Sequence, residues 1–172
     1  MRISVGLFFS FCFVANFIYS QLPVGSWQAH LPYASSKAIV NAGNKFFVAS
    51  ETGMFSYDVS DNSLDTYSKI NGLSDVGLNA LAYDPAQNIL IIGYTNGNLD
   101  ILQDNVFYNL PDVKNKDLQG RKDIYNICIH NNKAYLACDF GVVLMDVEKR
   151  EIADAYLLSQ YVSNLKIGRA HV

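Results

Sequence analysis

Short apolar runs separated by polar turns recur along the chain and define its predicted architecture. Gly53, Gly97 and Gly141 follow one another at intervals of 44 residues. One apolar run precedes each glycine and another follows it, a pattern typical of a β-hairpin in which the glycine supplies a positive φ at the turn. The runs before the glycines are 46–49, 89–92 and 134–137, and the runs after them are 54–57, 99–102 and 142–145.

Each predicted hairpin has a further strand on either side. First strands are expected at 38–40, 78–83 and 127–129, and fourth, more polar strands at 64–67, 106–108 and 152–156. Four short strands every 44 residues are typical of a β-propeller, whose blades take about 40 to 50 residues each. The nearly continuous apolar runs indicate inner strands packed between neighbouring blades, and the polar alternation indicates an outer strand.

We therefore predict an all-β fold with little helix, a β-propeller of four-stranded antiparallel blades. About three blades are expected in this chain, as a partial propeller, at roughly 35–75, 76–123 and 124–165. Three blades do not close a ring, so we expect further blades in the natural protein.

The two ends of the chain differ from the repeats. Residues 1–20 carry one cation, Arg2, followed by an almost wholly apolar stretch from Val5 to Ile18, which is typical of a secretory signal peptide. Because that stretch is shorter than the roughly 20 residues of a membrane span, a permanent anchor is the weaker interpretation. Residues 166–172 follow a strand-like segment without turn residues and resemble a translated sequencing adapter. We expect them to be a non-native tail and the natural protein to continue beyond Leu165.

The composition fits a folded domain of this kind. Half of the 172 residues are hydrophobic and 17% are charged, which excludes a disordered tail, a collagen-like repeat and a cysteine-stapled miniprotein. The formal net charge of −3 leaves no basic surface typical of nucleic-acid binding, so DNA and RNA are disfavoured as partners.

Sequence motifs of catalysis or metal binding are missing. The chain contains no HExxH, GxSxG, phosphate-binding loop or EF-hand spacing. His30 is expected to make a structural hydrogen bond, and His130 to be a solvated residue beside a two-residue turn at Asn131 and Asn132. The acidic residues between the third and fourth strands of the first unit lack the glycine and the distal glutamate of a calcium loop and predict a polar hairpin: they are Asp58, Asp61 and Asp65. We expect no enzyme activity, no cofactor and no metal site.

Two cysteines, Cys128 and Cys138, lie after the apolar leader. If Asn131 and Asn132 form a turn, Cys128 faces Tyr135, whereas Cys138 lies three residues further on and points to the other sheet face. A disulfide is therefore disfavoured, and both cysteines are expected to be small buried hydrophobic residues.

The long connection from the second to the third unit, roughly 109–123, is the candidate binding segment. Propeller loops on one face commonly form recognition surfaces, and this loop concentrates the cations of an otherwise acidic chain. We predict that they contact anionic groups of a lipopolysaccharide or a partner; the alternative is a solvated loop whose charges are compensated by Asp112, Asp117 and Asp123. The predicted ligand-binding residues are Lys114, Lys116, Arg121 and Lys122.

Several motifs together resemble a known family. The stretch NGLSDVGLNALAYDPAQNILIIGYTNGNLDIL, residues 71–102, is similar to the blade motif of two-component-regulator propellers. More closely, WQAHLPY, SETGMFSYD, GYTNGNLDIL and the LPD of residues 110–112 together resemble the PorZ family of the type IX secretion system of Bacteroidetes. The resemblance runs through 21–165.

This resemblance implies a non-catalytic component of the surface attachment complex, exported and associated with the outer membrane. It implies that the protein works with the sortase PorU and with PorV and PorQ, and that it binds anionic lipopolysaccharide and presents it to the sortase. It also implies two propellers and a C-terminal domain like the type IX sorting signal.

The sequence is also compatible with two other classes of protein. The first is a periplasmic sensor propeller of a hybrid two-component regulator, because its blade motif is nearly the same. The second is a propeller hydrolase or lyase, whose further blades would supply the reacting groups. A membrane span followed by a kinase would favour the sensor.

Overall fold

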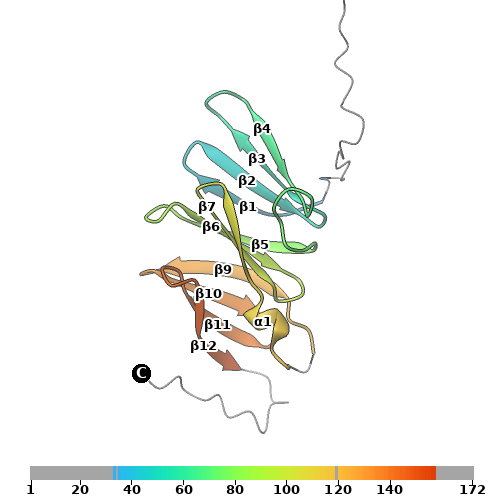
Figure 1. Ribbon diagram of the computed structural model, residues 1–172, viewed down its shortest axis with the longest axis vertical. Helices are drawn as coiled ribbons and strands as arrows, with labels where there is room; N and C mark the ends of the chain where they lie inside the picture. Colours follow the sequence, from blue (N-terminus) through green and yellow to red (C-terminus); the bar gives the residue numbers. More distant parts are fainter. Residues whose placement is uncertain (1–32, 34, 119, 158–172) are drawn as a thin grey trace, which may run out of the picture.

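The structure, a computed structural model, describes residues 33, 35–118 and 120–157. They form three four-stranded antiparallel sheets, each with its strands joined in chain order (Figure 1). The all-β, four-stranded blade architecture of a partial β-propeller is confirmed. The predicted signal peptide, His30 and the predicted tail at 166–172 lie outside the described residues.

The strand bounds agree with the predicted strands to within a few residues. Blade 1 comprises β1 (Ser36–Ala42), β2 (Lys45–Ser50), β3 (Met54–Asp58) and β4 (Leu64–Tyr67). Blade 2 comprises β5 (Leu78–Asp84), β6 (Ile89–Tyr94), β7 (Leu99–Gln103) and β8 (Val106–Leu110). Blade 3 comprises β9 (Ile124–His130), β10 (Lys133–Cys138), β11 (Gly141–Asp146) and β12 (Glu151–Leu157). A four-residue helix, α1 (Asp112–Asn115), lies between blades 2 and 3; in the part of the chain that the structure describes, no helix is long and apolar enough to cross a membrane.

The blades stack face to face, and their first strands β1, β5 and β9 lie side by side (Figure 1). Strand β6 shows why its sequence is a continuous apolar run. Ile89 and Ile91 belong to the hydrophobic cluster shared with blade 3, whereas Leu90 and Ile92 belong to the cluster shared with blade 1. Because side chains alternate across a strand, a strand packed on both faces has no polar position. Each such side chain contributes about 1.5–3 kcal/mol on burial.

The fourth strands are more exposed than the inner strands, as their polar residues predicted. In β4, three of the four residues are exposed and Leu64 retains 60% of its accessible surface. The outer strand of a blade meets solvent along one edge, so polar residues there cost no desolvation.

The glycines of the three hairpins do not all play the predicted part. Gly97 and Gly141 have φ of +81° and +146°, in the region that favours glycine. Gly53 is not among the residues with positive φ, so the prediction of a positive φ there is wrong. The turn of blade 1 is closed in another way: the Ser50 amide and hydroxyl each donate a hydrogen bond of 2.8 Å to the Gly53 carbonyl oxygen.

The cysteine prediction is correct in register and partly wrong in burial. Asn131 and Asn132 form the turn with φ of +49° and +59°, Cys128 pairs with Tyr135, and both cysteines are free thiols. Cys138 packs against the core, and burial raises its pKa to about 12. Cys128 is exposed rather than buried, because the neighbouring Ile127 takes the face that packs on blade 2.

The polar hairpin predicted in blade 1 is confirmed, since β3 pairs with β4. Asp58 accepts hydrogen bonds from the amide and hydroxyl of Ser60, and Asp61 accepts one from the Ser63 amide. These hydrogen bonds hold the pKa of both carboxyls below the ordinary value. His130 ends β9 and is exposed beside the turn, as expected.

Candidate binding surfaces

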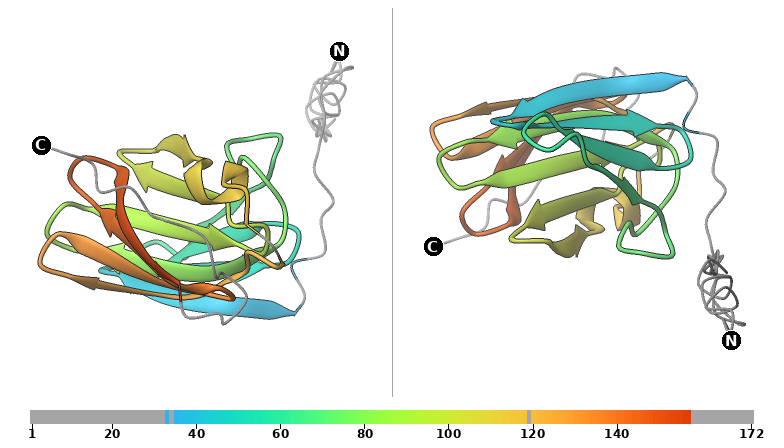
Figure 2. Two further views of the ribbon diagram at one scale, coloured as in Figure 1. Left: turned by 90° about the horizontal axis from the view of Figure 1, so that it is seen from below. Right: turned by 90° about the horizontal axis from the view of Figure 1, so that it is seen from above.

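Because successive strands run in opposite directions, the loops that connect them lie at two opposite ends of the blades. The connections between blades, 68–77 and the described residues 111–118 and 120–123, lie at one end of the strands together with the β2–β3, β6–β7 and β10–β11 turns. We call this end the connection face. The opposite end holds the remaining hairpin turns, and we call it the hairpin face. Both views in Figure 2 show α1 and the 68–77 connection at the same end of the stacked sheets.

Asp75 ties three loops of the connection face together. Its carboxylate accepts hydrogen bonds from Asn96 Nδ2 at 2.5 Å and from Lys114 Nζ at 2.7 Å, and Lys69 Nζ lies 3.8 Å away. Burial raises the pKa of Asp75, but the hydrogen bonds from Lys114 and Asn96 outweigh it and hold this pKa below the ordinary value. The carboxylate therefore joins the 68–77 connection, the β6–β7 turn and α1.

Lys122 closes the loop around α1. Its Nζ donates to the carbonyl oxygens of Lys114 and Lys116 at 2.6 and 2.5 Å. The last carbonyls of a helix lack partners within the helix, and a lysine ammonium there satisfies them. Lys122 is thus part of the loop's own structure.

Arg121 is bound to the residue that leads into β9. Its Nη2 and Nε atoms donate to the two carboxylate oxygens of Asp123 at 2.7 and 3.0 Å. Asp123 retains 4% of its accessible surface, and Arg121 holds the pKa of its carboxyl below the ordinary value. The same pair raises the pKa of Arg121. A two-pronged contact of this kind fixes the guanidinium in place.

The four predicted cations therefore share one loop but differ in their freedom. Within the described residues Lys114, Arg121 and Lys122 have intramolecular partners, whereas Lys116 is exposed and no partner of its side chain is found there. The side chains of Lys114 and Arg121 still retain 42% and 71% of their accessible surface. The arrangement can present positive charge to an anion, and ligand binding by these residues stays a prediction.

A buried acid that the sequence analysis missed holds the connection face in place. Asp100 on β7 is fully buried and accepts hydrogen bonds from Tyr94 Oη at 2.5 Å, the Ser74 amide at 2.8 Å and Asn109 Nδ2 at 2.9 Å. Burial, followed by the charge of Asp100, raises the pKa of Tyr94. The signal in the sequence was a single aspartate inside the apolar run 99–102, because a buried carboxylate requires donors around it.

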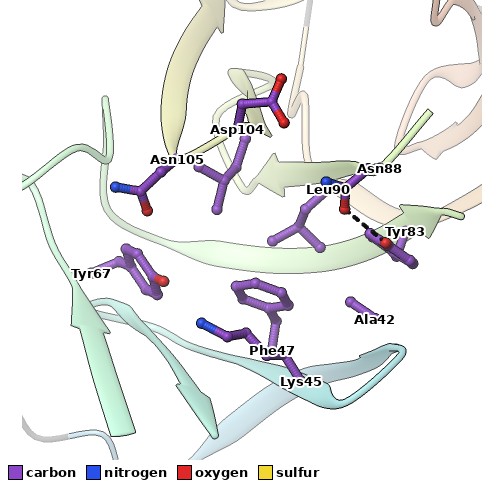
Figure 3. Close-up of a pocket in the computed structure, with 10 residues that line it drawn as sticks. Ala42, Lys45, Phe47, Tyr67, Tyr83, Asn88, Leu90, Asp104 and Asn105 are labelled. Carbon is purple, nitrogen blue, oxygen red and sulfur yellow. Dashed lines mark hydrogen bonds between the residues drawn. The ribbon is translucent and has the colours of Figure 1, made fainter. Parts of the chain in front are cut away.

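A pocket of about 260 Å³ opens between blades 1 and 2 toward the hairpin face. Its walls come from both blades: Phe47 and Tyr67 from blade 1, and Tyr83, Leu90 and Leu102 from blade 2. Figure 3 shows the Phe47 ring at the centre of the labelled side chains. The remaining lining residues are Ala42, Lys45, Asn88, Asp104 and Asn105. No sequence motif marks this pocket, because its walls are spread over six strands and two turns.

Comparison with known proteins identifies the family of the chain. Residues 46–171 match the family model of the N-terminal β-propeller domain of PorZ, of the type IX secretion system. A solved structure of PorZ, described as an essential bacterial surface component of the type IX secretion system of Porphyromonas gingivalis, is similar at a TM-score of 0.65 and 30% sequence identity. The similarity covers 70% of this chain and 16% of that PorZ chain. No curated protein matches the chain.

Two further solved structures share the fold. The extracellular domain of a putative one-component system from B. thetaiotaomicron matches at a TM-score of 0.61 and 11% identity, covering 76% of this chain and 18% of its own. The extracellular domain of a putative hybrid two-component system from the same organism matches at 0.60 and 12% identity, covering 71% and 17%. At these identities the likeness shows the fold alone. The family model, by contrast, spans well over half of the chain, and the chain therefore belongs to the family of the PorZ N-terminal β-propeller domain.

Proposed function

We propose that this chain is the N-terminal propeller of a non-catalytic, surface-exposed component of the type IX secretion system. The observation that supports this proposal is the match of residues 46–171 to the PorZ propeller family. The similar protein from P. gingivalis is described as a surface component of that system. In this proposal the protein binds anionic lipopolysaccharide, presents it to the sortase PorU, and works beside PorV and PorQ.

The connection face supplies a rigid, charged platform for this role. Asp75 and Asp100 fix the loops through hydrogen bonds to neighbouring segments, and Asp123 holds Arg121 of its own loop. Fixed loops bind with a smaller loss of conformational freedom than loops that must first become ordered. The exposed parts of Lys114, Lys116 and Arg121 would then contact phosphate or carboxylate groups of the lipopolysaccharide, and Lys122 would hold the loop in shape.

The experiment measures binding of the full-length protein to immobilised lipopolysaccharide from the bacterium that encodes it. Replacing Lys114, Lys116, Arg121 and Lys122 by alanine together should weaken binding about tenfold or more, because each exposed charge pair contributes up to roughly 1 kcal/mol. A Lys133→Ala, Lys149→Ala variant removes charge from the hairpin face and is the matched control.

Two results would contradict parts of this proposal. Unchanged affinity of the fourfold variant would remove the loop as the binding site. A full-length protein without measurable affinity for the lipopolysaccharide would contradict lipopolysaccharide binding itself. Lys116→Arg should keep the affinity, since the charge is retained and the Lys116 side chain has no partner among the described residues.

A further inference from the structure

The pocket between blades 1 and 2 has the chemistry of a small binding site. Phe47, Leu90 and Leu102 retain 8%, 2% and 7% of their accessible surface and form its apolar part. Tyr67 and Tyr83, both half-buried, add two aromatic rings. An apolar, aromatic-lined hollow with a few polar groups at its rim is the usual form of a small-molecule site.

The polar rim is supplied by two turn asparagines. Tyr83 Oη donates to Asn88 Oδ1 at 2.9 Å, which leaves both hydrogens of the Asn88 amide available as donors. Among the described residues, no hydrogen-bond partner of the Asn105 side chain is found, so its amide offers donors and an acceptor. In Figure 3, Asn105 and Tyr67 lie on one side of the Phe47 ring and Asn88 and Tyr83 on the other.

Charge contributes little inside this pocket. The carboxylate of Asp104 points away from the Phe47 ring (Figure 3). Lys45 Nζ lies 3.5 Å from Asp65, and the side chain retains 40% of its accessible surface. The volume of about 260 Å³ is just below the roughly 300–1,000 Å³ of pockets for drug-sized ligands, so the pocket suits one ring-sized group.

From this geometry we infer that the pocket binds a single uncharged sugar ring of a glycan. The apolar face of a pyranose packs on aromatic rings, and its hydroxyls need neutral donors and acceptors around the edge, which Asn88, Asn105 and the tyrosines provide. An aromatic or aliphatic peptide side chain would leave the rim amides without partners, at a cost in binding. This inference rests on the proposed function, because it assigns a neutral sugar of the same lipopolysaccharide to the hairpin face.

The test uses the full-length protein and the lipid-free polysaccharide released from that lipopolysaccharide by mild acid. An Asn88→Gly, Asn105→Gly variant keeps the turns, because glycine accepts the φ of +54° and +63° found there. Loss of hydrogen bonds from two amides should weaken binding about tenfold. Asn132→Gly, at a turn position with φ of +59° in blade 3, is the matched control and should leave the affinity unchanged.

A second variant blocks the pocket without removing a hydrogen bond. Ala42 lines the pocket and is half-buried, so Ala42→Trp should fill it and weaken binding by at least the same factor. Binding that is unaffected in both variants, while the unmodified protein binds the polysaccharide, overturns the pocket site and leaves the proposed function standing. Binding of intact lipopolysaccharide but not of the lipid-free polysaccharide also overturns the pocket site. Failure of the unmodified protein to bind either preparation overturns the inference together with lipopolysaccharide binding.

Discussion

The connection face and the hairpin face use their polar side chains in different ways. On the connection face the charged groups pair with one another: Asp75 with Lys114, Asp123 with Arg121, and Lys122 with carbonyls of the α1 loop. On the hairpin face, the pocket between blades 1 and 2 places the amides of Asn88 and Asn105 beside aromatic rings, and the Lys45–Asp65 pair there is exposed and, at 3.5 Å, longer than those pairs of the connection face. Charged residues that cluster in the sequence can therefore serve to hold a loop in shape as readily as to bind a ligand. A binding site for an uncharged ligand contains few charged residues, so no charge cluster in the sequence marks it.

The largest expected effect comes from the buried acid that anchors the connection face. Asp100→Ala leaves the Tyr94 hydroxyl and the Ser74 amide without their acceptor, and each unsatisfied buried donor costs about 1–3 kcal/mol. We expect the free energy of unfolding of the propeller to fall by about 3 kcal/mol or more, measured by chemical denaturation of the full-length protein. Asp104→Asn, which removes an exposed charge of the hairpin face and keeps a residue type that tolerates the φ of +49° found there, should change it by less than about 0.5 kcal/mol. Equal effects of the two substitutions would contradict the contrast between the faces.

Gly97 and Gly43 have similar backbone angles, so their alanine variants compare how tightly the two faces are packed. Gly97 on the connection face has φ of +81°, and a Cβ atom there would lie 2.9 Å from Lys122 Cβ. Gly43 on the hairpin face has φ of +71° and open space around it. Both alanine variants lose about 1–2 kcal/mol through backbone strain, and Gly97→Ala should lose about 1 kcal/mol more through overpacking. Denaturation of both variants checks this order, and a larger loss for Gly43→Ala would contradict it.

A smaller effect concerns the pH response of the connection face. Because the pKa of Asp75 is lowered in the folded protein, its stabilising contribution is present above the unfolded value of 3.8 and is lost as the pH falls through the folded pKa. Lys114→Ala removes one of the hydrogen bonds that lower this pKa, so the Asp75 pKa should rise. Carboxyl chemical shifts followed by NMR between pH 2 and 6 would measure it. A pKa of Asp75 at or above 3.8 in the unmodified protein would contradict the network.

Much of the fold follows from local sequence because its determinants are local. The run Ile89 to Ile92 is apolar throughout because β6 is buried on both faces, and the pair Asn131 and Asn132 forms a two-residue turn that sets the register of Cys128 with Tyr135. At Gly53 the repeat was a poor guide to the backbone angle. The Ser50 hydroxyl, three residues earlier, closes this turn, so Gly53 lacks the positive φ of Gly97 and Gly141 although it holds the same position in the repeat.

The sites were harder to predict because they depend on pairing across blades. The positions of Lys114 and Lys122 in the sequence revealed their charge, but not the Asp75 carboxylate 39 residues from Lys114 or the carbonyls that Lys122 contacts. The exposure of Cys128 depends on which face of β9 meets blade 2. The pocket joins Phe47 to Leu102 across two blades, a proximity that appears only when the blades stack.

A structure of the full-length protein bound to the lipid-free polysaccharide tests the contrast between the two faces most directly. We predict a sugar ring packed against Phe47, between Tyr67 and Tyr83, with its hydroxyls hydrogen-bonded to Asn88 and Asn105. Polysaccharide bound at the connection face while the pocket between blades 1 and 2 holds none would contradict the account.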